Sequence, residues 1–258
     1  MKLFYRKYGA GKPLFILHGL FGQSDNWQGP AKVIAEWGFE VYCIDLRNHG
    51  QSPHDPSFTY TDMVNDLIAL INELHFTKVS FIGHSMGGKV LLELSNHAPQ
   101  IIDQLVIVDI GLKYYPPHHQ DVIAAIQAVN FDKCKTRSEV ERVLSEWIGE
   151  PSVRQFLMKN IYWQTPDRLG WRFNSQAIIS NIDVVGDEII PNAIITNSDF
   201  EAIFMRGEHS SYILDEDLPQ IRNYFPDLEL ITIPAAGHWV HAEQPKLFLE
   251  ELQLHLKP

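Results

Sequence analysis

The first 110 residues alternate short apolar runs with longer segments of helical periodicity. The runs are four or five residues long and end at turns, as buried parallel strands do; they cover 14–17, 40–44, 79–82 and 104–108. Between them, 59–74 places apolar residues three and four apart after a capping Thr59, and 86–97 is a second helical segment that stops before Pro99. This rhythm predicts a parallel sheet connected by crossover helices.

The rhythm changes between residues 113 and 198. Three helical segments follow one another there, at 121–131, 138–148 and 153–161, without a clear strand between them. Strand patterns resume at 202–205 and 228–233, and a closing helix is expected over 244–256. We therefore predict one α/β domain over 1–258 that carries a helical cap insertion at 113–198.

Composition narrows the class of protein. The chain has 258 residues, 45% hydrophobic and 21% charged, which is typical of a globular protein that buries a core. Its net charge of −11 argues against a nucleic-acid partner. No signal peptide is recognisable, and no apolar stretch reaches the roughly 18 residues of a membrane span. Cys43 and Cys134 lie too far apart for a zinc or disulfide framework, so we expect a reducing, cytoplasmic location.

The segment Gly83-His84-Ser85-Met86-Gly87 directly follows one predicted strand and directly precedes a predicted helix. A serine hydroxyl is a poor nucleophile, so it must project toward a base from a tight turn, where glycines avoid collisions. The strand–turn–helix context predicts such a nucleophile elbow, with Ser85 as the nucleophile. The helix start and the Met86 N–H would stabilise negative charge that develops there. The alternative is a glycine-rich turn with an incidental serine.

An acyl-transfer site needs a second N–H group that converges on the same oxygen. The loop His18-Gly19-Leu20-Phe21-Gly22 follows the strand at 14–17, and we expect Leu20 to supply that group. An ordinary strand-to-helix turn is the alternative, and His18 is expected to be a structural hydrogen-bonding residue.

Twelve histidines compete for the role of general base, and position decides among them. His238 follows the last predicted strand, on a loop at the carboxyl edge of the sheet, where ligands of open α/β sheets bind. An imidazole there can take the Ser85 proton and return it to the leaving group. His241 is a weaker candidate. His118 and His119 suggest a metal, but a third ligand at a usable spacing is missing, so we expect a solvated pair and no metal site.

Four segments together resemble the α/β-hydrolase-fold serine hydrolases over essentially the whole chain. They read HGLFG at 18–22, DLRNHGQS at 45–52, GHSMGG at 83–88 and PAAGHW at 234–239. The resemblance implies a mostly parallel eight-stranded sheet with flanking helices and a Ser–acid–His triad. It also implies a helical cap inserted after the sixth strand, where this chain loses its strand–helix rhythm.

The acid departs from the commoner family pattern, a Gly-x-x-Asp turn after the seventh strand. Here that turn reads Gly207-Glu208-His209-Ser210, with serine at the expected acid position. A carboxylate is still needed to orient the histidine, and Asp109 ends the strand at 104–108. The resemblance is sharpest to the YbfF-type bacterial short-chain carboxylesterases, which use that strand end and carry an RGxxSxY(I/V) stretch like 206–213. We choose Asp109, and Glu208 stays open as the alternative.

The predicted reaction is hydrolysis of short- to medium-chain carboxylic esters through an acyl-enzyme on Ser85, with acyl-CoA thioesters among the candidate substrates. It requires no metal or organic cofactor, and the expected partner is a small-molecule ester or thioester. Two alternatives stay open: a lyase or carbon–carbon bond hydrolase like the menaquinone-pathway members of the fold, and a ligand-binding module without turnover. The sequence does not determine the oligomeric state.

Three aromatic residues are predicted to form the walls of the substrate pocket. They are Phe21, Trp163 and Trp239. Packing in the core beneath the cap explains the same residues equally well.

Overall fold

The computed structural model describes residues 1–116 and 119–258. Within these residues, the central element is a sheet of seven strands. The strand order is β1-β3-β2-β4-β5-β8-β9; β1 runs antiparallel to β3 and the other pairs are parallel. The mostly parallel sheet predicted from the sequence is therefore confirmed. The strands are β1 (Tyr5–Gly9), β2 (Lys12–Leu17), β3 (Phe39–Ile44), β4 (Val79–His84), β5 (Ile102–Val108), β8 (Glu201–Gly207) and β9 (Glu229–Ile233).

The expected count of eight strands is wrong for the described residues, which contribute seven strands to this sheet. The strand that leads to Asp109 is consequently β5 of this structure. The apolar pattern also did not predict β1, whose Arg6 and Lys7 interrupt the hydrophobic run. At the edge of a sheet a strand is only partly buried, so its sequence does not show a continuous apolar run.

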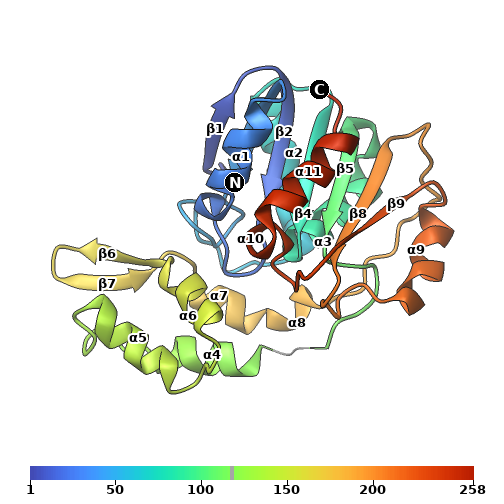
Figure 1. The fold of residues 1–258 in the computed structure, drawn as a ribbon. Helices are drawn as coiled ribbons and strands as arrows, with labels where there is room; N and C mark the ends of the chain where they lie inside the picture. Colours follow the sequence, from blue (N-terminus) through green and yellow to red (C-terminus); the bar gives the residue numbers. More distant parts are fainter. Residues whose placement is uncertain (117–118) are drawn as a thin grey trace.

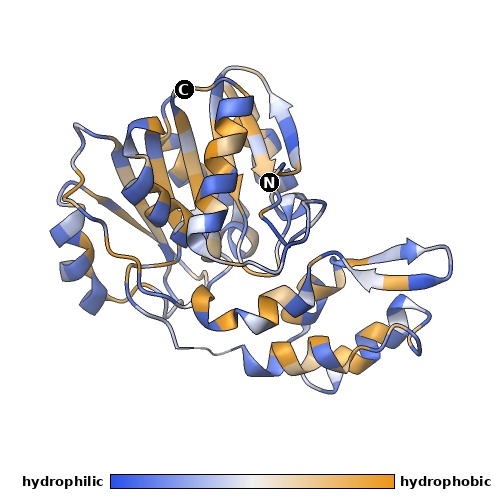
Figure 2. Ribbon diagram, turned by 180° about the vertical axis from the view of Figure 1, so that it is seen from behind, coloured by the Kyte–Doolittle hydropathy of each residue, from blue (hydrophilic) through white to orange (hydrophobic). Residues whose placement is uncertain are grey.

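Helices cover both faces of the sheet (Figure 1). Leu14 and Ile16 pack in one core with α1 (Gln28–Ala35) and α11 (Pro245–His255), and α10 (Val240–Glu243) adds Val240 to it. Phe15 and Leu17 point to the other core, which includes α2 (Tyr60–Glu73), α3 (Met86–His97) and α9 (Leu218–Tyr224). Because both faces are buried, the central strands are apolar throughout, as the hydropathy colouring of Figure 2 shows.

Strand register brings three loops to one edge of the sheet. Leu17 of β2 pairs with Gly83 of β4, and His84 of β4 pairs with Val108 of β5. The residues that follow these strand ends therefore emerge side by side at the carboxyl edge, where open α/β sheets bind ligands.

Of the residues between β5 and β8, those from 120 to 185 gather beyond this edge (Figure 1), and residues 189–198 run back along the sheet to the start of β8. The segment was expected to be helical, and this is wrong for 161–171, where a two-stranded hairpin forms. Ile161, Tyr162 and Trp163 favour a strand, and Pro166 with Asp167 makes the turn, so the helix expected over 153–161 ends at Met158. The elements are α4 (Gln120–Ala128), α5 (Arg137–Ser145), α6 (Pro151–Met158), β6 (Ile161–Thr165), β7 (Arg168–Trp171), α7 (Ser175–Ser180) and α8 (Ile182–Val185).

Within the described ranges, none of the helices has the length and apolar character that a membrane span requires.

Candidate active site

Ser85 occupies a strained turn between β4 and α3, with φ 53° and ψ −120°. Positive φ is unfavourable for a residue with a side chain, so the surroundings must hold it. Its N–H donates to the Val108 carbonyl at 3.0 Å. A Cβ on Gly83 would lie 2.5 Å from the Gly87 carbonyl oxygen, and one on Gly87 would lie 2.5 Å from that of Leu17. The close approach of these backbones explains both glycines of the segment.

The structure brings Asp109 and His238 together, although 129 residues separate them: His238 Nδ1 lies 2.7 Å from Asp109 Oδ2. Asp109 is fully buried and has φ 52° directly after β5. Glu208, the alternative acid, instead accepts a hydrogen bond from the Ala235 N–H at 2.9 Å. The geometry therefore favours Asp109 as the carboxylate that orients the histidine.

Two further donors hold the Asp109 carboxylate. The Gly207 N–H donates to Oδ1 at 3.1 Å, and the Ser210 hydroxyl donates to Oδ2. Burial raises the pKa of Asp109 to about 6, and these hydrogen bonds oppose that rise. Ser210 occupies the turn position where most family members are expected to carry the acid. The serine at that position was the one sequence signal for this contact. It could be interpreted only once the structure placed Asp109 beside it.

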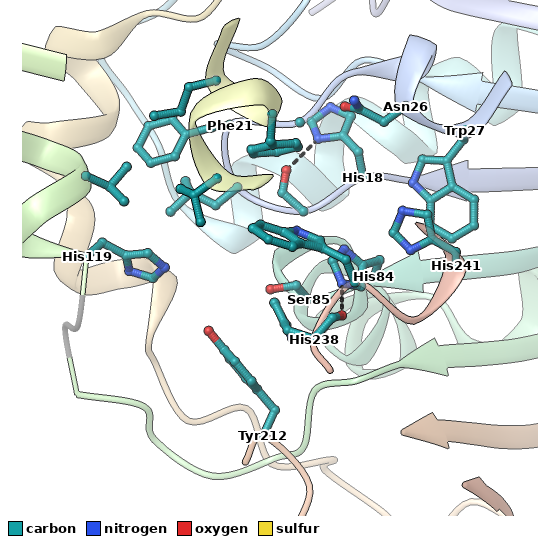
Figure 3. A pocket seen from close by; sticks show the side chains of 18 residues that line it. His18, Phe21, Asn26, Trp27, His84, Ser85, His119, Tyr212, His238 and His241 are labelled. Carbon is teal, nitrogen blue, oxygen red and sulfur yellow. Dashed lines mark hydrogen bonds between the residues drawn. The ribbon is translucent and has the colours of Figure 1, made fainter. Parts of the chain in front are cut away.

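His238 is also fixed by residues that the sequence did not identify. The Tyr212 ring stacks on its imidazole at a centroid distance of 3.8 Å and an interplanar angle of 14°. His84 Nε2 lies 2.8 Å from the His238 carbonyl oxygen, which fixes the loop (Figure 3). Burial lowers the pKa of His84 to about 3, so this ring is neutral and adds no charge beside His238.

The candidate oxyanion donors belong to Leu20 and Met86, which line a cavity together with Ser85. The neighbouring N–H groups are engaged, that of Phe21 with His49 Nε2 at 3.1 Å and that of Gly22 with the Gly19 carbonyl at 2.9 Å. The Leu20 and Met86 N–H groups have no acceptor in the part of the chain that the structure describes. They are available for an oxygen atom bound beside Ser85.

The other candidate histidines have different neighbours from those of His238. His18 Nδ1 lies 2.8 Å from the Gly19 carbonyl oxygen and its Nε2 accepts the Leu46 N–H, as expected for a structural residue. His241 stacks on Trp27 at 4.0 Å and is not bonded to Asp109. Among the described residues, no group of three or more potential ligands could hold a metal ion; His118 lies outside them.

The cavity that Ser85 and His238 line together, hereafter the main cavity, has a volume of about 90 Å³ (Figure 3), and it shares Tyr212, His238 and Trp239 with a cavity of about 420 Å³. Phe21 and Trp239 line the main cavity, as predicted for wall residues, and α6 contributes Phe156. The prediction for Trp163 is wrong: this residue does not line the cavity and its side chain is 54% exposed. It lies on β6 of the hairpin, which extends away from the sheet edge (Figure 1).

A second, smaller cavity of about 30 Å³ is also lined by Ser85. Besides Leu20, Ser85, Met86 and Tyr212, its walls come from two segments, one after β5 and one around α8. The residues that form these walls are Ile110, Tyr115, Pro116, His119, Ile182, Val185 and Gly186.

Three comparisons with known proteins agree with this geometry. The family model described as the α/β hydrolase fold matches residues 12–245. The sn-1-specific diacylglycerol lipase ABHD11 of Danio rerio is 37% identical over 97% of this chain and 80% of its own length. Esterase YbfF of Escherichia coli K12 is 34% identical over 95% of this chain and 92% of its own. The structure of a marine microorganism esterase is 39% identical, with a TM-score of 0.94 and 99% of both chains covered.

These relatives are esterases and lipases, and the match of sequence and fold extends over nearly the whole chain. They indicate that this protein is a hydrolase of the esterase or lipase type. The chain belongs to the α/β-hydrolase fold family.

Proposed function

We propose that this protein hydrolyses short- to medium-chain carboxylic esters through an acyl-enzyme on Ser85. The observation that carries the proposal is the 2.7 Å contact between His238 Nδ1 and Asp109 Oδ2, in a cavity that His238 and Ser85 line together. A serine and a histidine that line one cavity, with a carboxylate bound to the histidine, are the groups that acyl transfer requires. In this proposal residues 113–198 form a cap over the site within a single domain.

The first half of the reaction forms the acyl-enzyme. Ser85 Oγ attacks the carbonyl carbon while His238 takes the hydroxyl proton, and the negative charge on the carbonyl oxygen is held by the Leu20 and Met86 N–H groups. Collapse of the tetrahedral intermediate breaks the bond to the alcohol oxygen, which receives the proton from His238. Asp109 keeps the proton-bearing Nδ1 in place and stabilises the imidazolium.

The second half releases the acid. Water attacks the acyl-enzyme carbon as His238 removes one of its protons, and the proton returns to Ser85 Oγ when the acyl–oxygen bond breaks. A thioester would follow the same steps with a thiol as leaving group, so acyl-CoA is a candidate substrate. The net charge of −11 provides no overall attraction for that anion.

The two cavities suggest where each half of the ester lies. The leaving group takes its proton from His238, so we place it in the main cavity, which His238 and Ser85 line together. The smaller cavity is lined by Ser85, Leu20 and Met86 and not by His238, which suits the acyl group. Its volume of about 30 Å³, against about 90 Å³ for the main cavity, favours short acyl chains.

The location of the protein stays a prediction. Cys43 and Cys134 are both buried and free, which supports the expected reducing, cytoplasmic compartment.

A p-nitrophenyl ester series from acetate to octanoate tests the proposed function, with butyryl-CoA as the thioester probe. We expect turnover of the short esters, loss of activity in Ser85→Ala, and a fall in kcat of about 10⁴-fold in Asp109→Asn. Glu208→Gln is the matched control for the acid and should stay active. An active Asp109→Asn would move the acid elsewhere, and a wild type inert toward every ester would favour the lyase or the binding module.

A further inference from the structure

Lys89 is a buried cation that the reaction does not use. It lies on α3, one helical turn after Ser85, and its side chain is fully buried. Its Nζ donates to three backbone carbonyls: Leu112 at 3.0 Å, Lys113 at 2.8 Å and Asp187 at 2.7 Å. An ammonium group has three N–H donors, so every donor has an acceptor.

The three carbonyls belong to the two segments that form the walls of the smaller cavity. Leu112 and Lys113 precede Tyr115 on the segment that leaves β5, and Asp187 follows Gly186 on the segment that leaves α8. The Tyr115 N–H also donates to the Gly186 carbonyl at 2.8 Å. The two walls are thus joined directly to each other and, through one ammonium, to the helix that begins directly after Ser85.

We propose that Lys89 is a positioning residue that holds both walls of the smaller cavity against α3 and so sets the acyl-chain length that the enzyme accepts. The inference rests on the proposed function, in which this cavity takes the acyl group. Without the ammonium, three buried carbonyls lose their donor, which is costly unless the segments move apart toward water. Separated walls would admit longer acyl chains.

The protonation state of Lys89 provides an independent way to test the same contact. Burial lowers its pKa to about 7; the Asp187 and Glu188 carboxylates oppose this change and Lys113 adds to it. The Tyr115 ring faces the same nitrogen, at 5.1 Å. A neutral amine has two N–H groups for three carbonyls, so in the wild type the walls should loosen as the pH rises through about 7.

Acyl-chain selectivity of Lys89→Met tests the proposal. Methionine keeps the length and apolar stem of the side chain and removes the donors. The ratio of kcat/KM for p-nitrophenyl butyrate to that for the octanoate should fall about tenfold or more, the value of at least one methylene in a fitted pocket. Rates within an acetate series with different alcohols should keep their relative order, because the leaving group lies in the other cavity. An unchanged acyl ratio would overturn the inference.

Lys113→Met is the matched control. Lys113 Nζ also lies over the Tyr115 ring, at 5.4 Å, but it binds the Asp217 carboxylate at 2.6 Å and not the wall carbonyls. Below pH 7, where the Lys89 ammonium is charged in both proteins, it should keep the wild-type acyl ratio, and a change as large as that of Lys89→Met would overturn the assignment.

The wild type alone provides a second test if Lys89→Met does not fold. Ionisation of His238 affects all acyl chains alike and cancels in the ratio, whereas loosening of the walls does not. The wild-type butyrate-to-octanoate ratio should therefore fall as the pH rises through about 7. Turnover with a ratio that is independent of pH would refute the role of Lys89 and leave the esterase proposal intact. Absence of turnover on any ester would overturn both.

Discussion

Replacing Ser210 with alanine isolates one contact of the candidate acid. The Ser210 hydroxyl donates to Asp109 Oδ2, the same oxygen that lies 2.7 Å from His238 Nδ1. The change removes this donor while the Gly207 N–H still binds Oδ1 at 3.1 Å. It therefore probes the charge of the carboxylate and leaves its position largely fixed.

The size of the effect follows from the strength of the lost bond. A hydrogen bond to a charged group contributes roughly 1.5–3 kcal/mol, which corresponds to a change of about one to two pKa units. Burial already raises the pKa of Asp109 to about 6, and the Ser210 bond opposes that rise. In Ser210→Ala the pKa of Asp109 should therefore increase further, so the ionised form that supports the imidazolium is lost at a higher pH.

The assay is the pH dependence of kcat/KM for p-nitrophenyl butyrate. We expect the acid limb of the profile to move upward by about one to two pH units in Ser210→Ala. Ser211→Ala is the control, because Ser211 is exposed and the hydroxyl that binds Asp109 is that of its neighbour Ser210. An acid limb at the wild-type pH in a folded Ser210→Ala would refute the reasoning.

Three further predictions follow from the same geometry. Because burial raises the pKa of Asp109 in the folded state, the carboxyl's contribution to stability should be lost as the pH rises through about 6; urea unfolding should show that Asp109→Asn lacks this pH dependence. Gly87→Ala places a Cβ 2.5 Å from the Leu17 carbonyl oxygen and should lower the free energy of unfolding by about 1–3 kcal/mol, whereas Gly149→Ala meets no atom within 4 Å and should not. Trp239→Ala should raise KM for p-nitrophenyl esters, and Trp163→Ala, whose side chain is 54% exposed, should leave steady-state kinetics unchanged.

The sequence by itself determined the features whose physical cause is local. Buried parallel strands must be apolar on both faces, so the central strands could be recognised in the sequence as continuous apolar runs. A serine between two glycines, after such a strand and before a helix, identified the turn at Ser85 because close backbone approach excludes larger residues there. The role of His238 could be predicted for a related reason, because the loop after the last strand lies at the carboxyl edge of the sheet.

Only the tertiary structure decided the features that depend on contacts between distant segments. Asp109 and Glu208 are both acids near strand ends, and only the packing of β5 beside β8 directs Asp109 toward His238. Trp163 is a large aromatic residue of the kind that lines pockets, but it lies on a hairpin formed around a two-residue turn. In the sequence Lys89 is indistinguishable from an ordinary helix lysine. Its three carbonyl acceptors are brought to it only when segments 23 to 98 residues away fold around it. Local patterns fix which elements form, whereas the direction and partners of a buried polar side chain are set by the long-range packing that removes it from water.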